Sequence, residues 1–225
     1  MRWSYGVTTV PKRRDDLLPR TLASLALAGF EQPRLFIDGS GQGFERFGLE
    51  STFHDPPLRC YGNWVASLWE LYVRDPLADR YAIFQDDFVT YRHLREYLEQ
   101  CQQPQRGYLN LYTFPKNQAM ANGRNGWYLS DQLGKGAVAL VFTNEAVVTL
   151  LSSPYMVNRP KDVNRGYKWV DGGIVTAFKL VGWKEYVHNP SLVQHTGTES
   201  SVGNRLQPLA LSFRGEQFDA RELLT

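Results

Sequence analysis

The sequence predicts an α/β domain in which helices flank a mostly parallel sheet. Strand-like and helix-like segments alternate along most of the 225 residues, and no internal repeat or linker interrupts them. Acidic residues also follow two apolar strands directly, at Asp38 and at Asp86–Asp87. In open α/β sheets ligands bind outside the carboxyl ends of the strands, so these acids indicate a site there.

The strands are marked by apolar or alternating runs that end at turn residues. Pro11 ends the first run because proline cannot donate to a ladder, and an acid and a glycine end the second. The predicted strands are 3–10, 34–40, 80–89, 107–114, 136–142 and the alternating stretch that begins at 184, with one short strand expected between 41 and 59.

The helices are marked by apolar residues that recur on one face and by capping residues. In the first helix Leu18, Leu22 and Leu25 share a face and Gly29 ends it. The predicted helices are 13–30, 62–75, 91–101, 144–153 and 170–183. We expect residues 1–205 to form one domain and residues 206–225 to form a loosely attached C-terminal tail.

Composition narrows the function classes. The hydrophobic fraction of 43% suits a globular core, and a formal charge of +2 is too small to indicate nucleic acid or a membrane surface as the partner. Cys60 and Cys101 form neither a disulfide framework nor a zinc motif. No leader-like segment or spanning apolar stretch is present, so we expect a soluble, cytoplasmic protein without a transmembrane segment.

The stretch "YAIFQDDFVT" places Asp86 and Asp87 side by side after an apolar strand. Adjacent carboxylates repel each other unless a positive group lies beside them. A divalent cation such as Mg²⁺ or Mn²⁺ is one such partner, since these ions use carboxylates together with substrate phosphates. A second interpretation is that the two aspartates cap the turn or the helix that begins near Tyr91.

Two short stretches carry a resemblance to a known family. "FQDD" resembles the DxD-type signature of glycosyltransferases with the GT-A fold, a Rossmann-type α/β fold. "NPSLVQHTGTESSVGN" is similar to the C-terminal segment of the N-acetylglucosaminyltransferase IV family, which has a P-S-L-x-Q-H-x-G-x-x-S-S pattern. Its fixed positions match Pro190, Ser191, Leu192, Gln194, His195, Gly197, Ser200 and Ser201. Gln85 stands where that family more often has Glu, and the membrane anchor of the Golgi enzymes has no counterpart here.

This resemblance implies roles for the acids and for one histidine. Asp87 would be the principal ligand of Mn²⁺ or Mg²⁺, with His195 as a second metal or diphosphate ligand. Asp86 would bind ribose or sugar hydroxyls or reach the metal through water, and Asp38 would contact the uracil or ribose. The nucleotide would be lined by Thr8, Thr9, Val10 and Arg13 or Arg14. From the residues alone, Asp38 also fits a turn, His195 a loop histidine, and the two arginines a solvated basic pair.

The later part of the chain offers candidates for catalysis and sugar binding. Sugar transfer with inversion needs a base for the acceptor hydroxyl, and Asp171 fits because two glycines follow it and leave room for a substrate. An N-cap is the other interpretation of Asp171. Lys135 lies in a glycine-flanked stretch that would approach the donor or form a hairpin-like turn. Trp127 and Tyr128 are candidate stacking platforms for a sugar, and one edge of a packed loop is their other interpretation.

Together these observations predict a metal-dependent, inverting glycosyltransferase. It would move a sugar from a nucleotide-diphosphate sugar, a UDP-sugar such as UDP-GlcNAc, to a hydroxyl of a glycan or other acceptor. Two alternatives remain open: a metal-dependent phosphohydrolase or nucleotidyltransferase, and a non-catalytic carbohydrate-binding protein. The enzyme hypothesis predicts that Asp171→Asn and Asp87→Ala abolish turnover, whereas a binding protein would tolerate both.

Overall fold

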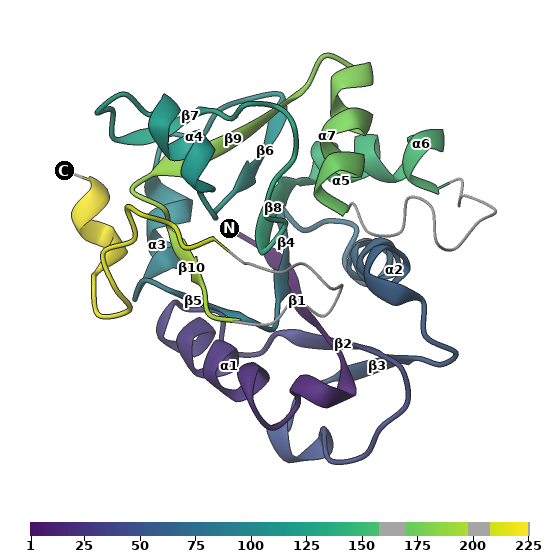
Figure 1. Cartoon of the computed structure of the whole chain (residues 1–225). Helices are drawn as coiled ribbons and strands as arrows, with labels where there is room; N and C mark the ends of the chain where they lie inside the picture. Colours follow the sequence, from purple (N-terminus) through teal and green to yellow (C-terminus); the bar gives the residue numbers. More distant parts are fainter. Residues whose placement is uncertain (158–169, 198–207, 225) are drawn as a thin grey trace.

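The computed structural model describes residues 1–157, 170–197 and 208–224, and its centre is one large sheet (Figure 1). The sheet has eight strands in the order β3-β2-β1-β4-β8-β6-β9-β7. Their bounds are β1 (Trp3–Thr9), β2 (Arg34–Asp38), β3 (Ser51–His54), β4 (Arg80–Gln85), β6 (Gly107–Asn110), β7 (Gly126–Leu129), β8 (Ala139–Thr143) and β9 (Lys184–Asn189). The predicted α/β class is confirmed, and the short strand expected between 41 and 59 is β3.

The sheet is mixed in direction, and so it is less parallel than the sequence predicts. β3, β2, β1 and β4 run parallel to one another, as do β6 and β9. β8 is antiparallel to both β4 and β6, and β7 is antiparallel to β9. An apolar run such as that of β8 shows that a strand is buried but not which way it runs, because the connections set the direction.

Helices cover both faces of the sheet (Figure 1). Leu18 and Leu25 of α1 and Leu94 of α3 belong to the core on one face. Trp64 of α2 and Phe178 of α7 belong to the core on the other face. The helices are α1 (Leu17–Leu27), α2 (Arg59–Arg74), α3 (Leu94–Gln100), α4 (Pro115–Met120), α5 (Asn144–Leu151), α6 (Pro154–Val157) and α7 (Val170–Leu180), with short 3₁₀ helices η1 (Pro11–Arg13), η2 (Glu45–Phe47) and η3 (Ala220–Leu224).

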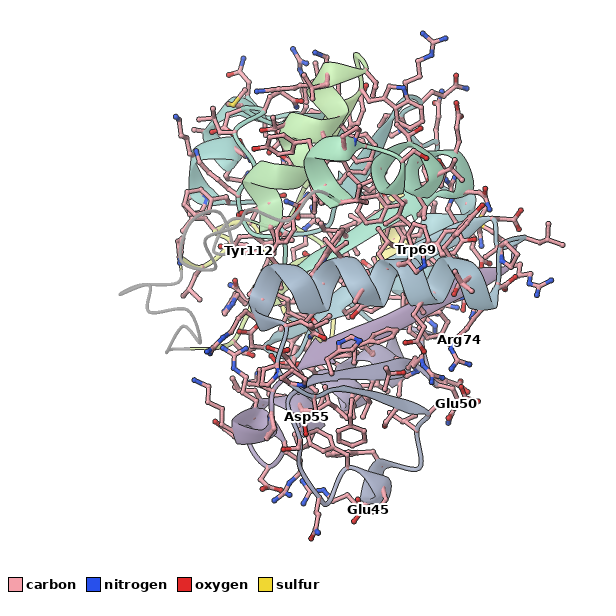
Figure 2. All side chains as sticks on the ribbon, turned by 90° about the vertical axis from the view of Figure 1, so that its right-hand side faces the viewer. Glu45, Glu50, Asp55, Trp69, Arg74 and Tyr112 are labelled. Carbon is pink, nitrogen blue, oxygen red and sulfur yellow. The ribbon has the colours of Figure 1, made fainter. Side chains whose placement is uncertain are left out.

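Strand β4 lies at the centre of this arrangement, between β1 and β8. Its residues from Tyr81 to Phe84 are completely buried, since helices pack over both sides of the strand. Figure 2 looks onto the α2 side, where α2 crosses in front of the sheet and its labelled Trp69 is half exposed. β4 therefore provides a rigid, two-sided support for whatever follows its last residue.

The C-terminal segment is packed against the domain and is not the loosely attached tail that we expected. Phe213 stacks on Tyr91 with ring centroids 4.8 Å apart, and Phe218 meets the same ring edge-on at 4.9 Å. Ala220 is fully buried, and its N–H donates to the carbonyl of Arg92 at 2.9 Å. These contacts join the described residues 208–224 to the core next to α3.

None of the helices in the described ranges is long and apolar enough to span a bilayer.

His188 of β9 has a structural role inside the core. Its side chain is 1% exposed, its Nδ1 lies 2.7 Å from the carbonyl oxygen of Pro190, and its Nε2 lies 2.5 Å from the hydroxyl of Tyr97. A neutral ring satisfies both contacts when Nδ1 donates and Nε2 accepts. Burial lowers the pKa of His188 from 6.5 to about 4, because a charged ring would lose its hydration.

We expect the stability of the fold to fall as the pH drops from about 6.5 to about 4. The unfolded chain takes up the His188 proton at the higher pH and the folded chain only at the lower one, so acid favours unfolding by about 3 kcal/mol through this residue. Urea unfolding of the wild type and of His188→Gln should give curves of stability against pH that diverge in this window. Parallel curves would contradict the assignment.

Candidate functional site

The residues of the candidate site meet where the parallel strands β1, β2 and β4 end. Thr9 ends β1, Asp38 ends β2, and Asp86 and Asp87 follow β4 directly. Because these strands run in the same direction, their carboxyl ends lie at one edge of the sheet. The sheet topology therefore brings together the acids that the sequence singled out.

Asp86 and Asp87 are both buried, and Arg13 lies between them. One nitrogen of Arg13, Nη1, lies 2.5 Å from Asp86 Oδ1 and 2.6 Å from Asp87 Oδ2. The second oxygen of Asp86 accepts a hydrogen bond of 2.6 Å from the hydroxyl of Thr9. Asp86, Asp87 and Arg13 are 2%, 1% and 8% exposed, so Arg13 belongs to a buried ion cluster. Arg14 instead forms the solvated pair considered from the sequence, 2.5 Å from the exposed Asp15.

His195 completes this cluster from the other end of the chain. The two-stranded antiparallel pair β5 (Phe88–Thr90) and β10 (Val193–His195) places His195 opposite Phe88. The N–H of Thr196 donates to the backbone carbonyl of Asp87 at 2.8 Å, and His195 Nε2 lies 3.2 Å from Asp87 Oδ2. The structure thus brings together Asp87 and His195, which the sequence analysis assigned to one site.

The two carboxylates have opposite shifts in pKa. Burial raises the pKa of Asp86, the charge of Arg13 lowers it, the charge of Asp87 raises it again, and the net pKa lies above its usual value. Burial also raises the pKa of Asp87, but the hydrogen bond from His195 and the charge of Arg13 outweigh that effect, so its pKa is lowered. Asp87 is therefore the carboxylate whose ionised form the cluster favours.

Asp38 serves the start of helix α2. Its Oδ1 accepts hydrogen bonds from the backbone N–H groups of Leu58 at 2.6 Å and Arg59 at 3.2 Å. The first N–H groups of a helix have no partner within the helix, and a carboxylate there also suits the helix dipole. Asp38 thus fixes the entry of α2 beside the acids that follow β4.

Asp171 lies at the start of α7 and is held by backbone donors. Its Oδ2 accepts from the N–H of Gly136 at 2.9 Å, and its Oδ1 accepts from the N–H of Gly172 at 3.0 Å. Burial raises the pKa of Asp171 although these two hydrogen bonds oppose the shift. Gly134 has a φ of +68°, and a Cβ there would lie 2.4 Å from the carbonyl oxygen of Asp171, so only glycine fits this approach.

Cys60 lies in the first turn of α2, next to Arg59, whose N–H donates to Asp38, and no sequence pattern singled it out. Burial raises the pKa of its thiol to about 11, with further contributions from the charges of Asp171, Asp38 and Asp87, while Arg13 lowers it. The sequence carries no signal for this environment of Cys60, because a lone cysteine in a helix has many uses.

The remaining residues expected to bind the donor make contacts within the protein. The hydroxyl of Thr8 donates to the carbonyl of Phe84 at 3.2 Å, and the carbonyl of Val10 accepts from the N–H of Arg13 at 3.0 Å. The ammonium of Lys135 donates to Asp131 and lies 5.3 Å from the ring centre of Phe114. The structure therefore directs the Lys135 side chain to Asp131.

Trp127 and Tyr128 lie on β7, the edge strand beyond β9, and not beside the carboxylates. Trp127 packs on His188 with ring centroids 4.8 Å apart. Tyr128 is 8% exposed, and its hydroxyl donates to the carbonyl of Asn117 at 2.9 Å. This packing favours the second interpretation of these residues, in which they are packed and do not form a platform for a sugar: Tyr128 is buried, and Trp127 is partly buried against the core.

The described residues do not fit a divalent metal at the carboxylate pair. Asp86 uses both of its oxygens, and Asp87 Oδ2 is shared by Arg13 and His195. Of the four oxygens of this carboxylate pair, only Asp87 Oδ1 is buried without a partner among the residues described. Within those residues, no group of three or more His, Cys, Asp or Glu side chains could hold a metal ion.

The comparisons with known proteins show the fold and no closer relationship. No protein-family model and no curated protein sequence matches the chain. The chain is similar to the crystal structure of GalNAc-T7 with UDP, GalNAc and Mn²⁺, with a TM-score of 0.57 and 10% identity over 96% of this chain and 45% of that chain. It thus spans less than half of that structure. The structure of A197 from STIV gives a TM-score of 0.48 and 11% identity over 88% of this chain and 86% of that one.

The likeness to GalNAc-T7, a GT-A glycosyltransferase, confirms the predicted GT-A-like fold. The comparisons do not support the resemblance to the N-acetylglucosaminyltransferase IV family. Of the positions that carried that resemblance, Ser200 and Ser201 lie outside the described residues.

We expect Arg13→Gln to lower the free energy of unfolding by about 3–5 kcal/mol, because it leaves two buried carboxylates without their cation. The matched control is Arg20→Gln, which removes an exposed ion pair of 2.5 Å with Glu216 and should cost about 0–1 kcal/mol. Urea unfolding at neutral pH measures both. Equal losses would show that Arg13 is no more important to the fold than a surface arginine.

Proposed function

We propose that the chain is a glycosyltransferase that takes a sugar from a nucleotide-diphosphate sugar and passes it to an acceptor hydroxyl. The observation that carries this proposal is the placing of three acids in a GT-A-like sheet: Asp38 ends β2, Asp87 follows β4, and Asp171 contacts Gly136 just before β8, which begins beside the end of β4. GalNAc-T7, whose structure is similar to this chain, was crystallised with UDP and GalNAc. A UDP-sugar, with UDP-GlcNAc as one candidate, is therefore the donor we propose.

In the proposed reaction Asp171 is the base. It accepts the proton of the acceptor hydroxyl while that oxygen attacks the anomeric carbon, and the bond to the nucleoside diphosphate breaks on the opposite face. The N–H groups of Gly136 and Gly172 hold the carboxylate in place. Burial raises its pKa, which makes the carboxylate a stronger acceptor for a proton than an exposed aspartate.

The ends of β1 and β2 form the proposed donor side of the site. Thr9 fixes Asp86, and Asp38 fixes the start of α2, so both strand ends are rigid where the nucleotide would lie. The acceptor is a glycan or another molecule with a hydroxyl group. GalNAc-T7 was crystallised with Mn²⁺, but because the described residues here do not fit a metal at the carboxylate pair, no step of the proposed reaction passes through one.

We expect Asp171→Asn to lower kcat by about 10²–10⁴-fold and to leave UDP binding unchanged, because the amide cannot take a proton from the acceptor. The measurements are UDP release from UDP-GlcNAc in the presence of glycan acceptors and calorimetric titration with UDP. Asp75→Asn is the matched control, since its carboxylate pairs with Arg2 at 2.6 Å, beside the start of β1 and away from the carboxyl ends of the strands.

Three outcomes would contradict the proposal. Full activity of Asp171→Asn would remove the proposed base. Absence of UDP binding with and without divalent ions would remove the UDP-sugar donor. Release of phosphate from nucleotides without sugar transfer would favour the phosphohydrolase alternative.

A further inference from the structure

The carboxylate pair already contains a cation, and that cation belongs to the chain. Arg13 Nη1 lies within 2.6 Å of one oxygen from each aspartate. A single donor atom thus bridges the two carboxylates in the way that a shared metal ion would. Since a guanidinium stays protonated in proteins, Arg13 remains charged under all ordinary conditions.

The carboxylate oxygens are nearly all in use. Asp86 accepts from Thr9 and Arg13, and Asp87 Oδ2 lies within 3.2 Å of both Arg13 and His195. For a metal ion to enter between the carboxylates, Arg13 would have to leave a position in which its side chain is 9% exposed. Separating a buried ion pair costs several kcal/mol, so an ion from solution must first overcome that loss.

The orientation of His195 also disfavours a metal. The N–H of Gly197 donates to His195 Nδ1 at 3.1 Å, so Nδ1 is an acceptor and the ring hydrogen is on Nε2. Nε2 faces Asp87 Oδ2 at 3.2 Å and acts as a hydrogen-bond donor to it. The nitrogen that points at the carboxylates therefore has no lone pair to offer a metal ion.

We propose that Arg13 is the resident cation of the Asp86–Asp87 pair, and that the site binds its ligand without a divalent ion between these carboxylates. Asp87 Oδ1, buried and without a partner among the described residues, is the acceptor that remains. It receives a ligand hydroxyl, of the ribose or of the sugar. This last assignment rests on the proposed function, whereas the role of Arg13 does not.

The test of Arg13 uses Mn²⁺ alone, without nucleotide. Mn²⁺ is titrated into the wild type, Arg13→Gln and the double variant Arg13→Gln with Asp87→Asn, and bound ion is followed by electron paramagnetic resonance. We expect Arg13→Gln to bind Mn²⁺ at least about tenfold more tightly than the wild type, because the vacated carboxylates then need a cation, and the double variant to lose that gain. Mn²⁺ should also raise the Tm of Arg13→Gln and not that of the wild type.

The proposal is overturned if the wild type binds Mn²⁺ tightly and Asp87→Asn abolishes that binding, which is a result that does not require Arg13→Gln to fold. If Arg13→Gln is unfolded even with Mn²⁺, Arg13→Lys replaces it. Lysine keeps the charge, so Arg13→Lys should bind Mn²⁺ no better than the wild type, and tight binding by this variant would count against the proposal.

Titration with UDP then separates this inference from the proposed function. If UDP binds equally well in EDTA and in Mn²⁺, and Asp87→Asn weakens UDP binding by about tenfold, the role of Arg13 and the proposed function are both supported. If UDP binds only with Mn²⁺ and only when Asp87 is intact, the glycosyltransferase proposal survives and the role of Arg13 is overturned. If UDP does not bind under any condition, the proposed function fails, while the Mn²⁺ titration still decides the role of Arg13.

Discussion

One guanidinium nitrogen between two neighbouring carboxylates is the interaction on which the rest of the site depends. Without Arg13, two buried negative charges would face each other at the end of the central strand β4. Its hydrogen bonds join η1 to Asp86 and Asp87, which lie 73 and 74 positions further along the chain. Through Asp87 the same cluster holds His195, so the first strand, the central strand and the late strand β10 meet at one point.

Much of the fold could be predicted from local patterns. The apolar run of β4, the helical periodicity of α1 and the acids at strand ends depend on residues close together in the sequence. The grouping of Asp87 with His195 was also predicted, although it came from motif resemblance and not from periodicity. The antiparallel direction of β8 and the docking of Phe213 on Tyr91 could not be predicted, because they depend on contacts between distant segments.

The roles of individual side chains were harder to predict than their positions. Arg13 was expected to contact a nucleotide, yet its place is set by carboxylates that no local pattern connects to it. Trp127 has the flat aromatic side chain that can stack on a sugar, but β7 places its ring against His188. Asp38 ends a strand as predicted and also caps a helix that begins 21 residues later. Residue type indicates what a side chain can do, and topology decides which partner it meets.

The pairing of β10 with β5 has a consequence for the order of events during synthesis. Asp87 and Arg13 leave the ribosome before His195 and the backbone N–H of Thr196, which both contact Asp87 and lie more than one hundred positions further along the chain. The parallel strands β1, β2 and β4 can therefore assemble before the partner of β5 exists. Until β10 is added, β5 is an unpaired strand that another chain could occupy, so the site itself offers a nascent chain one place for association.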